Sequence, residues 1–222
     1  MLFPDLHAKK FGYINLNAAA ELWFVQNRIA PMDANPLLDP EVCDEMVQQL
    51  HEELGVDFSY GGWLEDRKAL WRGSYLDDER AYLHLGVDFS VPAGARVAAE
   101  VPAKVVRIDS DVPLEGGWGT RVILAPTDGS DYLMYAHLDS TVECAVGDSV
   151  SPGQVFARVG MAPTNGGWFS HLHVQCVEKS FFDHALTQDL MEIDGYGREA
   201  DRAQLSRIFQ DPLQFVFAGS RR

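Results

Sequence analysis

The strongest restriction on the fold is a series of short apolar stretches between about residue 82 and residue 178, separated by turn residues. The stretches read RVAAEV, AKVVRI, TRVILAP, DYLMYAHL, QVFARVG and SHLHVQCV. Asp128-Gly129 stands between two of them, and Asp-Gly between β-rich runs is a strong hairpin signal. Many short strands with frequent turns are typical of an all-β sandwich or barrel, so we expect a mainly β fold.

Helical signals flank this β region. Residues 36–54 predict a helix, because Asp39 can cap the first turn, Pro40 is tolerated there and Gly55 suits the end. The residues expected to face a core recur every four positions: Val42, Met46, Leu50 and Leu54. Residues 57–82 are rich in aromatic and turn residues and are expected to form an extended lead-in. Residues 199–210 predict a short C-terminal helix.

These differences predict three parts in the chain of 222 residues. Residues 1–60 form an N-terminal helical extension, residues 61–183 the β domain, and residues 184–222 a C-terminal tail that packs on the domain. The role of the first part stays open between simple scaffolding and a regulatory cover over the site.

The formal charge of −15 restricts the partners of this protein. An acidic surface repels phosphate backbones and anionic membrane surfaces, so we expect no nucleic acid as a partner. No stretch approaches the ~20 apolar residues that a membrane span needs. The three cysteines, Cys43, Cys144 and Cys176, argue against a disulfide scaffold and fit a reducing compartment.

The first 24 residues make a poor secretory signal, because Asn15, Asn17 and Glu21 interrupt a mildly apolar stretch. We therefore expect a cytoplasmic protein as numbered. The alternative is a periplasmic or extracellular protein whose leader was removed before this numbering begins. The oligomeric state is not predicted by the sequence.

Four of the seven histidines fall in three short motifs inside the β region. His84-Leu85-Gly86-Val87-Asp88 places an imidazole and a carboxylate on one face if the motif is a single strand. His171-Leu172-His173 places two imidazoles on one face by the same period of two, and His137 stands at the end of a predicted strand. Taken singly, each motif is also explained by hydrogen-bonded polar residues at a strand edge.

Taken together and in this order, the three motifs resemble the lysostaphin-like (LytM-like) zinc endopeptidases, which cut bacterial cell-wall peptides. The resemblance covers roughly residues 82–178 and includes HLGVDFSVPAGARVAA, LMYAHLDS and NGGWFSHLHVQ. It implies a lysostaphin-like β-sandwich with a duplicated hybrid motif, and one Zn²⁺ per chain. It also implies His84, Asp88 and His173 as metal ligands, with His137 and His171 as unliganded active-site histidines. Val101-Pro102-Ala103 departs from the tight glycine turn of many relatives.

This set of side chains suits a catalytic metal. Zn²⁺ takes nitrogen and oxygen ligands tetrahedrally, and three protein ligands leave the fourth position for water. Lowering the pKa of water from about 15.7 to about 7 makes hydroxide easier to form by ~12 kcal/mol. Our hypothesis is that His171 acts as the base and His137 pairs with the oxyanion. A rival zinc motif beginning at His51 fails, because Gly55 stands where the second ligand is needed.

Four residues are candidates for substrate binding. Asn165 and Trp168 belong to the glycine-rich segment before the HxH strand, which is either one wall of a cleft or a loop whose Trp caps the core. Tyr82 and Trp118 are weaker candidates.

Three functions remain open at this stage. The first is a zinc endopeptidase that cuts peptidoglycan peptides. The second is an intracellular zinc hydrolase that acts on other small peptides or amides. The third is a non-enzymatic binding module on the same fold, because a fold does not determine function. The complete set of five polar residues argues against the third.

Overall fold

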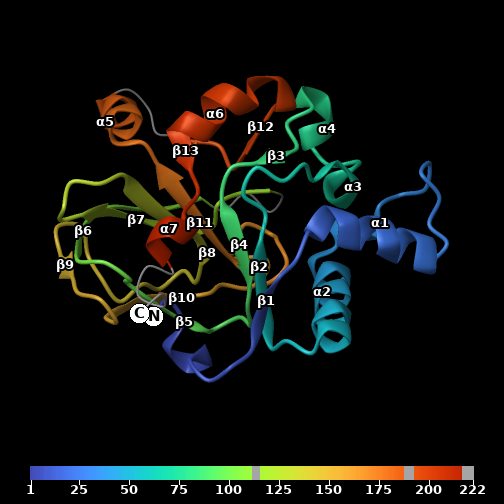
Figure 1. Cartoon of the computed structure of the whole chain (residues 1–222), viewed down its shortest axis with the longest axis horizontal. Helices are drawn as coiled ribbons and strands as arrows, with labels where there is room; N and C mark the ends of the chain where they lie inside the picture. Colours follow the sequence, from blue (N-terminus) through green and yellow to red (C-terminus); the bar gives the residue numbers. More distant parts are fainter. Residues whose placement is uncertain (112–115, 188–192, 217–222) are drawn as a thin grey trace.

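A computed structural model describes residues 1–111, 116–187 and 193–216, and in this part of the chain a large sheet carries helices at its edges (Figure 1). The strands are β1 (Phe11–Tyr13), β2 (Phe58–Gly61), β3 (Leu83–His84), β4 (Val87–Ser90), β5 (Arg96–Ala98), β6 (Ala103–Ser110), β7 (Thr120–Pro126), β8 (Tyr132–Leu138), β9 (Ser149–Val150), β10 (Val155–Arg158), β11 (Leu172–Val177), β12 (Tyr196–Gly197) and β13 (Phe209–Gln210). The α-helices are α1 (Leu16–Gln26), α2 (Pro40–Leu54), α3 (Lys68–Trp71), α4 (Leu76–Glu79), α5 (Lys179–Thr187), α6 (Arg202–Ile208) and α7 (Leu213–Val216). Short 3-10 helices are η1 (Pro4–Leu6), η2 (Pro36–Leu38) and η4 (Glu199–Asp201).

The large sheet has the strand order β1-β2-β4-β11-β8-β7-β6-β9, with β13 paired to β11. Its strands are antiparallel neighbours except for β1, which runs parallel to β2 at the edge. Two further pairs, β10-β5 and β12-β3, lie outside this sheet. The predicted hairpin is confirmed: β7 and β8 are antiparallel neighbours, and Gly129 between them has a φ of 80°.

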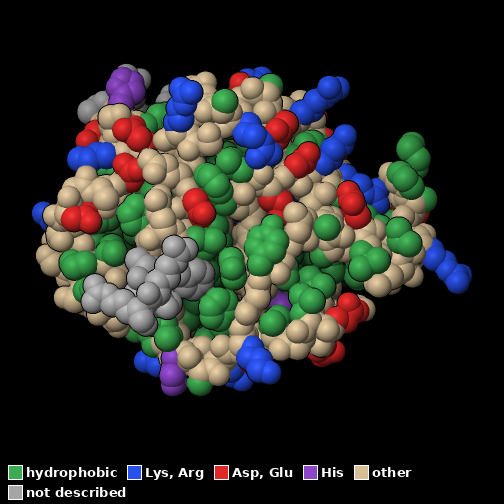
Figure 2. Space-filling model, in the orientation of Figure 1, with side chains coloured by type: hydrophobic (Ala, Val, Ile, Leu, Met, Phe, Trp, Pro, Cys, Tyr) green, Lys and Arg blue, Asp and Glu red, His purple; other side chains and the backbone are tan. Residues whose placement is uncertain are grey.

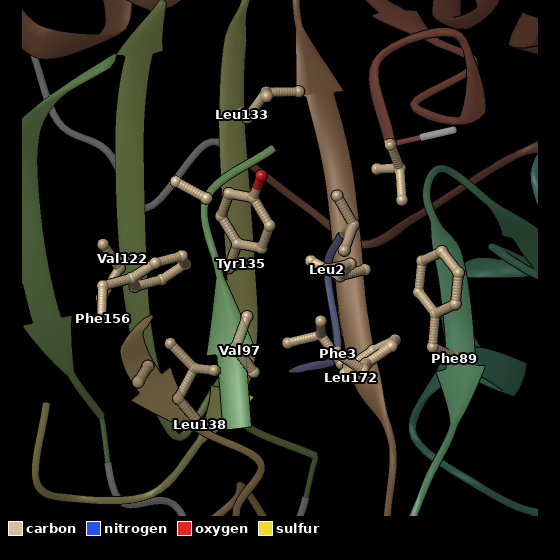
Figure 3. Close-up of a cluster of buried hydrophobic side chains, with 14 of the residues drawn as sticks. Leu2, Phe3, Phe89, Val97, Val122, Leu133, Tyr135, Leu138, Phe156 and Leu172 are labelled. Atoms are coloured by element: carbon tan, nitrogen blue, oxygen red, sulfur yellow. The ribbon is translucent and has the colours of Figure 1, made fainter. Parts of the chain in front are cut away.

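The main core lies on one face of the large sheet, where Val97 of β5 and Phe156 of β10 pack against β7, β8 and β11 (Figure 3). Tyr135 meets Phe156 edge to face, with ring centroids 5.1 Å apart. Because strand residues alternate between faces, burying Leu172 and Val174 in this core turns the residues between and beside them to the opposite face. That opposite face carries the polar side chains described below.

The predicted N-terminal helix is confirmed as α2. The Asp39 side chain accepts a hydrogen bond from the Glu41 N–H (2.9 Å), and Gly55 ends the helix in the left-handed conformation with a φ of 64°.

The predicted core stripe of this helix is wrong at its end, since Leu54 is 53% exposed. Each step of four residues turns the side chain by about 40° around the axis, so the three steps from Val42 to Leu54 leave the buried face. The fully buried residues follow the spacing of a helix face instead: Cys43, Met46 and Val47.

The lead-in of residues 57–82 is not simply extended, because it contains β2, α3 and α4. Its aromatic residues join a second core with α1 and α2, in which Trp71 contacts Phe169. The N-terminal residues also contribute β1 to the large sheet. The C-terminal helix is confirmed as α6, with η4 before it. The three-part division of the chain stays a prediction.

Figure 2 shows one face of the molecule, on which basic side chains are scattered among acidic ones, mostly around the rim. On this view of the described residues, the basic side chains form no large patch, which agrees with the formal charge of −15. Among the described residues, none of the helices is both long and apolar enough to cross a membrane. Cys43, Cys144 and Cys176 are all free thiols.

Candidate functional site

Three strands bring the HxxxD and HxH motifs together. His84 ends β3, Asp88 lies in β4, and His173 lies in β11 directly opposite Asp88 in the antiparallel register. The expected single strand from His84 to Asp88 is wrong, since β3 pairs with β12 while β4 pairs with β2 and β11. The chain leaves one strand pair and enters the other at Leu85 and Gly86, yet the side chains of His84 and Asp88 still lie next to each other.

Gly86 makes room for the third side chain of the group. A Cβ atom at this position would lie 2.5 Å from Nε2 of His173, which is closer than real contacts allow. The glycine between the two polar residues of the motif therefore allows the imidazole from β11 to lie against them.

The three side chains are almost completely buried, with exposed fractions of 1% for His84, 2% for Asp88 and 2% for His173. His84 Nε2 lies 3.1 Å from His173 Nδ1 and 3.4 Å from Asp88 Oδ1, and His173 Nδ1 lies 2.9 Å from Asp88 Oδ1. Atoms bound about 2.0–2.1 Å from a tetrahedral Zn²⁺ lie about 3.3 Å from one another. Two nitrogens and one oxygen at these separations fit a zinc ion.

Hydrogen bonds orient the two imidazoles. His84 Nδ1–H donates to the Gly62 carbonyl (3.0 Å), which leaves the Nε2 lone pair facing the group. His173 Nε2–H donates to Gln175 Oε1 (2.9 Å), and Gln175 Nε2 donates in turn to the Asp194 carbonyl (3.1 Å). Because each outer nitrogen carries the proton, each inner nitrogen can accept a metal.

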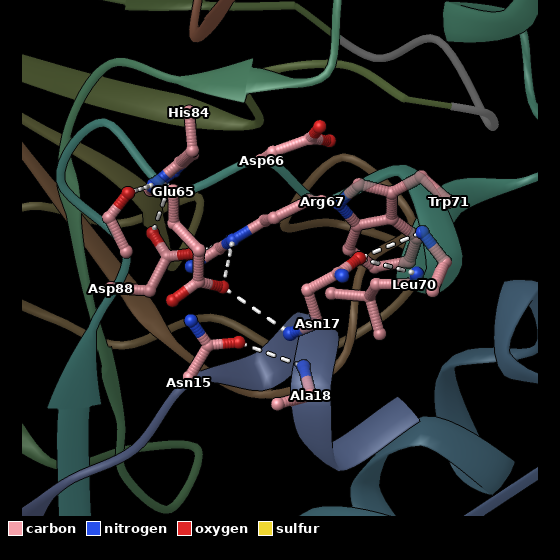
Figure 4. A network of polar contacts seen from close by, with 12 residues as sticks. Asn15, Asn17, Ala18, Glu65, Asp66, Arg67, Leu70, Trp71, His84 and Asp88 are labelled. Carbon is pink, nitrogen blue, oxygen red and sulfur yellow. Dashed lines mark hydrogen bonds and ion pairs between the residues drawn. The ribbon is translucent and has the colours of Figure 1, made fainter. Parts of the chain in front are cut away.

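Asp88 has a buried cation as its other partner. Arg67 is 0% exposed, and its Nη1 donates to Asp88 Oδ2 while Oδ1 faces the two histidines. Arg67 Nε donates to Glu65 Oε1 (3.2 Å), which also accepts from the Asn17 N–H (3.3 Å) in the first turn of α1 (Figure 4). The first helix is thus connected to Asp88 through two buried charged side chains.

His137 and His171 lie beside this group, with ring centroids 4.5 Å apart. Each donates Nδ1–H to a backbone carbonyl at 2.8 Å, His137 to Asn165 and His171 to Phe169, so both Nε2 atoms are free acceptors. His171 Nε2 lies 3.7 Å from Asp88 Oδ1. His137 has a φ of 62°, an uncommon conformation for a side-chain-bearing residue that is often found at functional sites.

Burial keeps these imidazoles neutral. Burial, with Arg67 nearby, lowers the pKa of His84 to about 3. Burial and the neighbouring His171 hold the pKa of His137 well below its ordinary value, and burial lowers the pKa of His171. Neutral imidazoles are the form that binds metals and accepts protons.

A cavity of about 240 Å³ opens beside the histidines. Its aromatic wall contains Trp71, Tyr75, Trp118, Trp168 and Tyr196, and its other charged residues are Asp111, Arg121 and Asp194.

Two of the four predicted substrate contacts, Trp118 and Trp168, line this cavity. Tyr82 is absent from its lining and packs in the second core. Asn165 is also absent from the lining; it is fully buried, and its side chain binds the backbone of Gly167, Trp168 and Phe169. We therefore assign Tyr82 and Asn165 packing roles.

Sequence reasoning missed Arg67, Arg121 and Tyr196. Tyr196 comes from the C-terminal tail, where β12 pairs with β3 so that Tyr196 lies opposite His84. Its hydroxyl accepts hydrogen bonds from Trp71 Nε1 (2.6 Å) and Arg67 Nη1 (3.4 Å), so its own proton is left to donate elsewhere. None of these residues belongs to a periodic pattern or a spacing motif that points to the site.

Comparison with known proteins agrees with this geometry. The family model of peptidase family M23 matches residues 82–183. The structure of LytU is 30% identical, over 46% of this chain and 74% of that one, with a TM-score of 0.38. The catalytic domain of EnpA, a prophage-encoded M23 protein from Enterococcus faecalis, is 26% identical over 43% of this chain and 68% of that one, with a TM-score of 0.38.

Lysostaphin, an antimicrobial peptidase from Staphylococcus simulans, is 25% identical over 61% of this chain, with a TM-score of 0.43. The alignment spans 44% of the lysostaphin chain. No curated protein sequence matches. The family-model match and the identity to LytU show the class of protein: the chain belongs to peptidase family M23, a family of hydrolases.

Proposed function

We propose that this protein is a zinc-dependent endopeptidase that hydrolyses peptide bonds of bacterial peptidoglycan, with one zinc ion per chain. The observation that carries the proposal is the convergence of His84 Nε2, Asp88 Oδ1 and His173 Nδ1 within 3.4 Å of one another. Membership of the M23 family supports it, and so does the similarity to lysostaphin, an antimicrobial peptidase. The lysostaphin-like β-sandwich with a duplicated motif is part of the same proposal.

In this proposal His84, Asp88 and His173 hold the metal. Zinc bound there would polarise the scissile carbonyl and make a nucleophilic water available near neutral pH. Arg67 holds Asp88 by its second oxygen, so that Oδ1 keeps its direction. Gln175 and the Gly62 carbonyl hold the two imidazoles in the tautomers that leave the inner nitrogens free.

The other two histidines handle protons. His171 Nε2 carries no proton and lies 3.7 Å from Asp88 Oδ1, so we assign it as the base that takes the proton of the attacking water. His137 is neutral at rest, because burial depresses its pKa. Because its Nδ1–H already donates to the Asn165 carbonyl, His137 can stabilise the oxyanion only in the form in which Nε2 also carries a proton.

The substrate occupies the cavity between Trp118 and Trp168. Trp118 stacks on His137 with ring centroids 6.0 Å apart, and Trp168 packs edge to face on Trp71 at 4.9 Å. Aromatic side chains that are already packed against neighbouring rings can bind a peptide with little loss of conformational entropy.

Two histidine variants test the proposal, with zinc content and digestion of purified sacculi as the measurements. His173→Ala is expected to lose both zinc and activity. His171→Ala is expected to keep zinc while its rate falls by about 10²–10⁴-fold. His7→Ala, which changes an exposed histidine, is the control and is expected to change neither. Full activity in a zinc-loaded His171→Ala protein would contradict the assignment of the base.

The second candidate is a zinc hydrolase that acts on small peptides or amides instead of cell-wall polymers. The small size of the cavity, about 240 Å³, favours it. A panel of dipeptides tested beside the sacculi separates the two, because only the first candidate releases soluble fragments from sacculi. A protein that binds no zinc and cleaves neither substrate would be a binding module.

A further inference from the structure

Arg121 in β7 lines the same cavity and has a donor without a partner. The residue is only 6% exposed. Its Nε donates to Asp109 Oδ2 (2.6 Å), and its guanidinium carbon lies 5.7 Å from the ring centroid of Trp118, so an ion pair and an aromatic ring both orient the guanidinium group. Its Nη1 is buried and makes no hydrogen bond among the described residues. A buried charged donor without a partner is unfavourable, and a ligand that accepts from it removes that penalty.

The charges around Arg121 favour an anion. Asp109 is shared, because Arg107 Nε donates to its other oxygen. Two guanidinium groups therefore share one carboxylate, which leaves a net positive charge in a protein whose formal charge is −15. Arg107 is not among the residues that line the cavity, so Arg121 alone presents this charge to a bound molecule.

The size of the favoured negative charge follows from the other groups in the cavity. Asp111 and Asp194 also line it, and Asp111 Oδ1 is buried without a hydrogen-bond partner in the part of the chain that the structure describes. These carboxylates repel a doubly charged group such as phosphate more strongly than a single carboxylate. The planar guanidinium also matches the geometry of a carboxylate.

We propose that Arg121 binds a free carboxylate of the peptide substrate, so that the site selects peptides whose carboxyl group beside the scissile bond is not amidated. This inference rests on the proposed peptidase function and adds the chemical class that the cavity prefers. Arg121 is a specificity residue, and Asp109 holds it in place.

Calorimetric titration of the zinc-loaded full chain tests the inference with two matched probes. The first is a peptidoglycan stem tetrapeptide with free carboxylates, and the second is the same peptide with every carboxylate converted to a carboxamide. The wild type is expected to bind the first about 10- to 100-fold more tightly, as a hydrogen bond to a charged group implies. The preference is expected to persist when the titration is repeated after zinc removal; a preference that disappears with the metal would come from zinc and would overturn the inference.

Two variants then locate the preference. Arg121→Gln is expected to abolish the preference, chiefly by weakening binding of the peptide with free carboxylates. Arg107→Gln, the matched control, removes the other partner of Asp109 outside the cavity lining, and it is expected to reduce the carboxylate preference less than Arg121→Gln does. Equal binding of both peptides by the wild type, or an unchanged preference in Arg121→Gln, would overturn the inference, and the wild-type result decides even if the variant fails to fold. Cleavage is recorded in parallel: a carboxylate preference without cleavage refutes the proposed peptidase function alone.

Discussion

Replacing Arg67 by Met removes the buried cation that neutralises Asp88. Both side chains are at most 2% exposed, and they form a direct ion pair. Methionine keeps an unbranched apolar chain in the same space, so the main loss is electrostatic. Asp88 would remain buried with only histidine partners, and Glu65 would lose its hydrogen bond from Arg67 Nε.

Removing one partner of a buried ion pair reduces the free energy of unfolding by about 3–5 kcal/mol. We expect a loss of this size in the Arg67→Met protein without metal. With zinc present we expect a clearly smaller loss, because a metal cation at Oδ1 again compensates the charge of Asp88. A ligand at 1,000 times its Kd adds about 4.1 kcal/mol of stability, which is enough to make the difference measurable.

The assay is urea unfolding of wild type and variant, once with a chelator and once with saturating zinc. Arg96→Met is the control, since Arg96 forms an exposed ion pair with Asp5 and such pairs contribute little. A loss below about 1 kcal/mol without metal would refute the reasoning, because removing one partner of a buried ion pair should reduce the free energy of unfolding by more than that. An equal loss with and without zinc would show that Asp88 is not the group that both cations neutralise.

Three further predictions follow from the site. Without metal, the free energy of unfolding should fall as the pH drops from about 6.5 toward 3. In this range the unfolded chain binds a proton at His84, whereas folded His84, with a pKa of about 3, does not, so this residue contributes a slope of about 1.4 kcal/mol per pH unit. Urea midpoints that stay constant across this range would contradict the prediction. Gly86→Ala brings a Cβ to 2.5 Å from His173 Nε2 and should weaken zinc binding about 10- to 100-fold in competition with a chelating dye; unchanged affinity would show that the ring can move away. Tyr196→Phe leaves Trp71 Nε1 without its acceptor and should lower the free energy of unfolding, measured in urea, by about 1–3 kcal/mol. An unchanged free energy of unfolding would contradict this prediction.

The sequence by itself determined the features that depend on local geometry. Strand periodicity placed His171 and His173 on one face, and the Asp-Gly pair at residues 128 and 129 marked the turn between β7 and β8. The caps at Asp39 and Gly55 marked both ends of α2. Each of these signals acts over a few residues, because it arises from backbone dihedrals and from the direction of neighbouring side chains.

Tertiary structure alone decided which distant groups surround the motif residues. Arg67 reaches Asp88 across 21 positions, and Tyr196 comes to lie opposite His84 only through the pairing of β12 with β3. The change of strand partners between His84 and Asp88, the Gly62 carbonyl on His84 and the unpaired donor of Arg121 also lack a local signal. The physical reason is that burial and charge pairing depend on where the whole chain passes, whereas periodicity and capping report only the conformation of each segment.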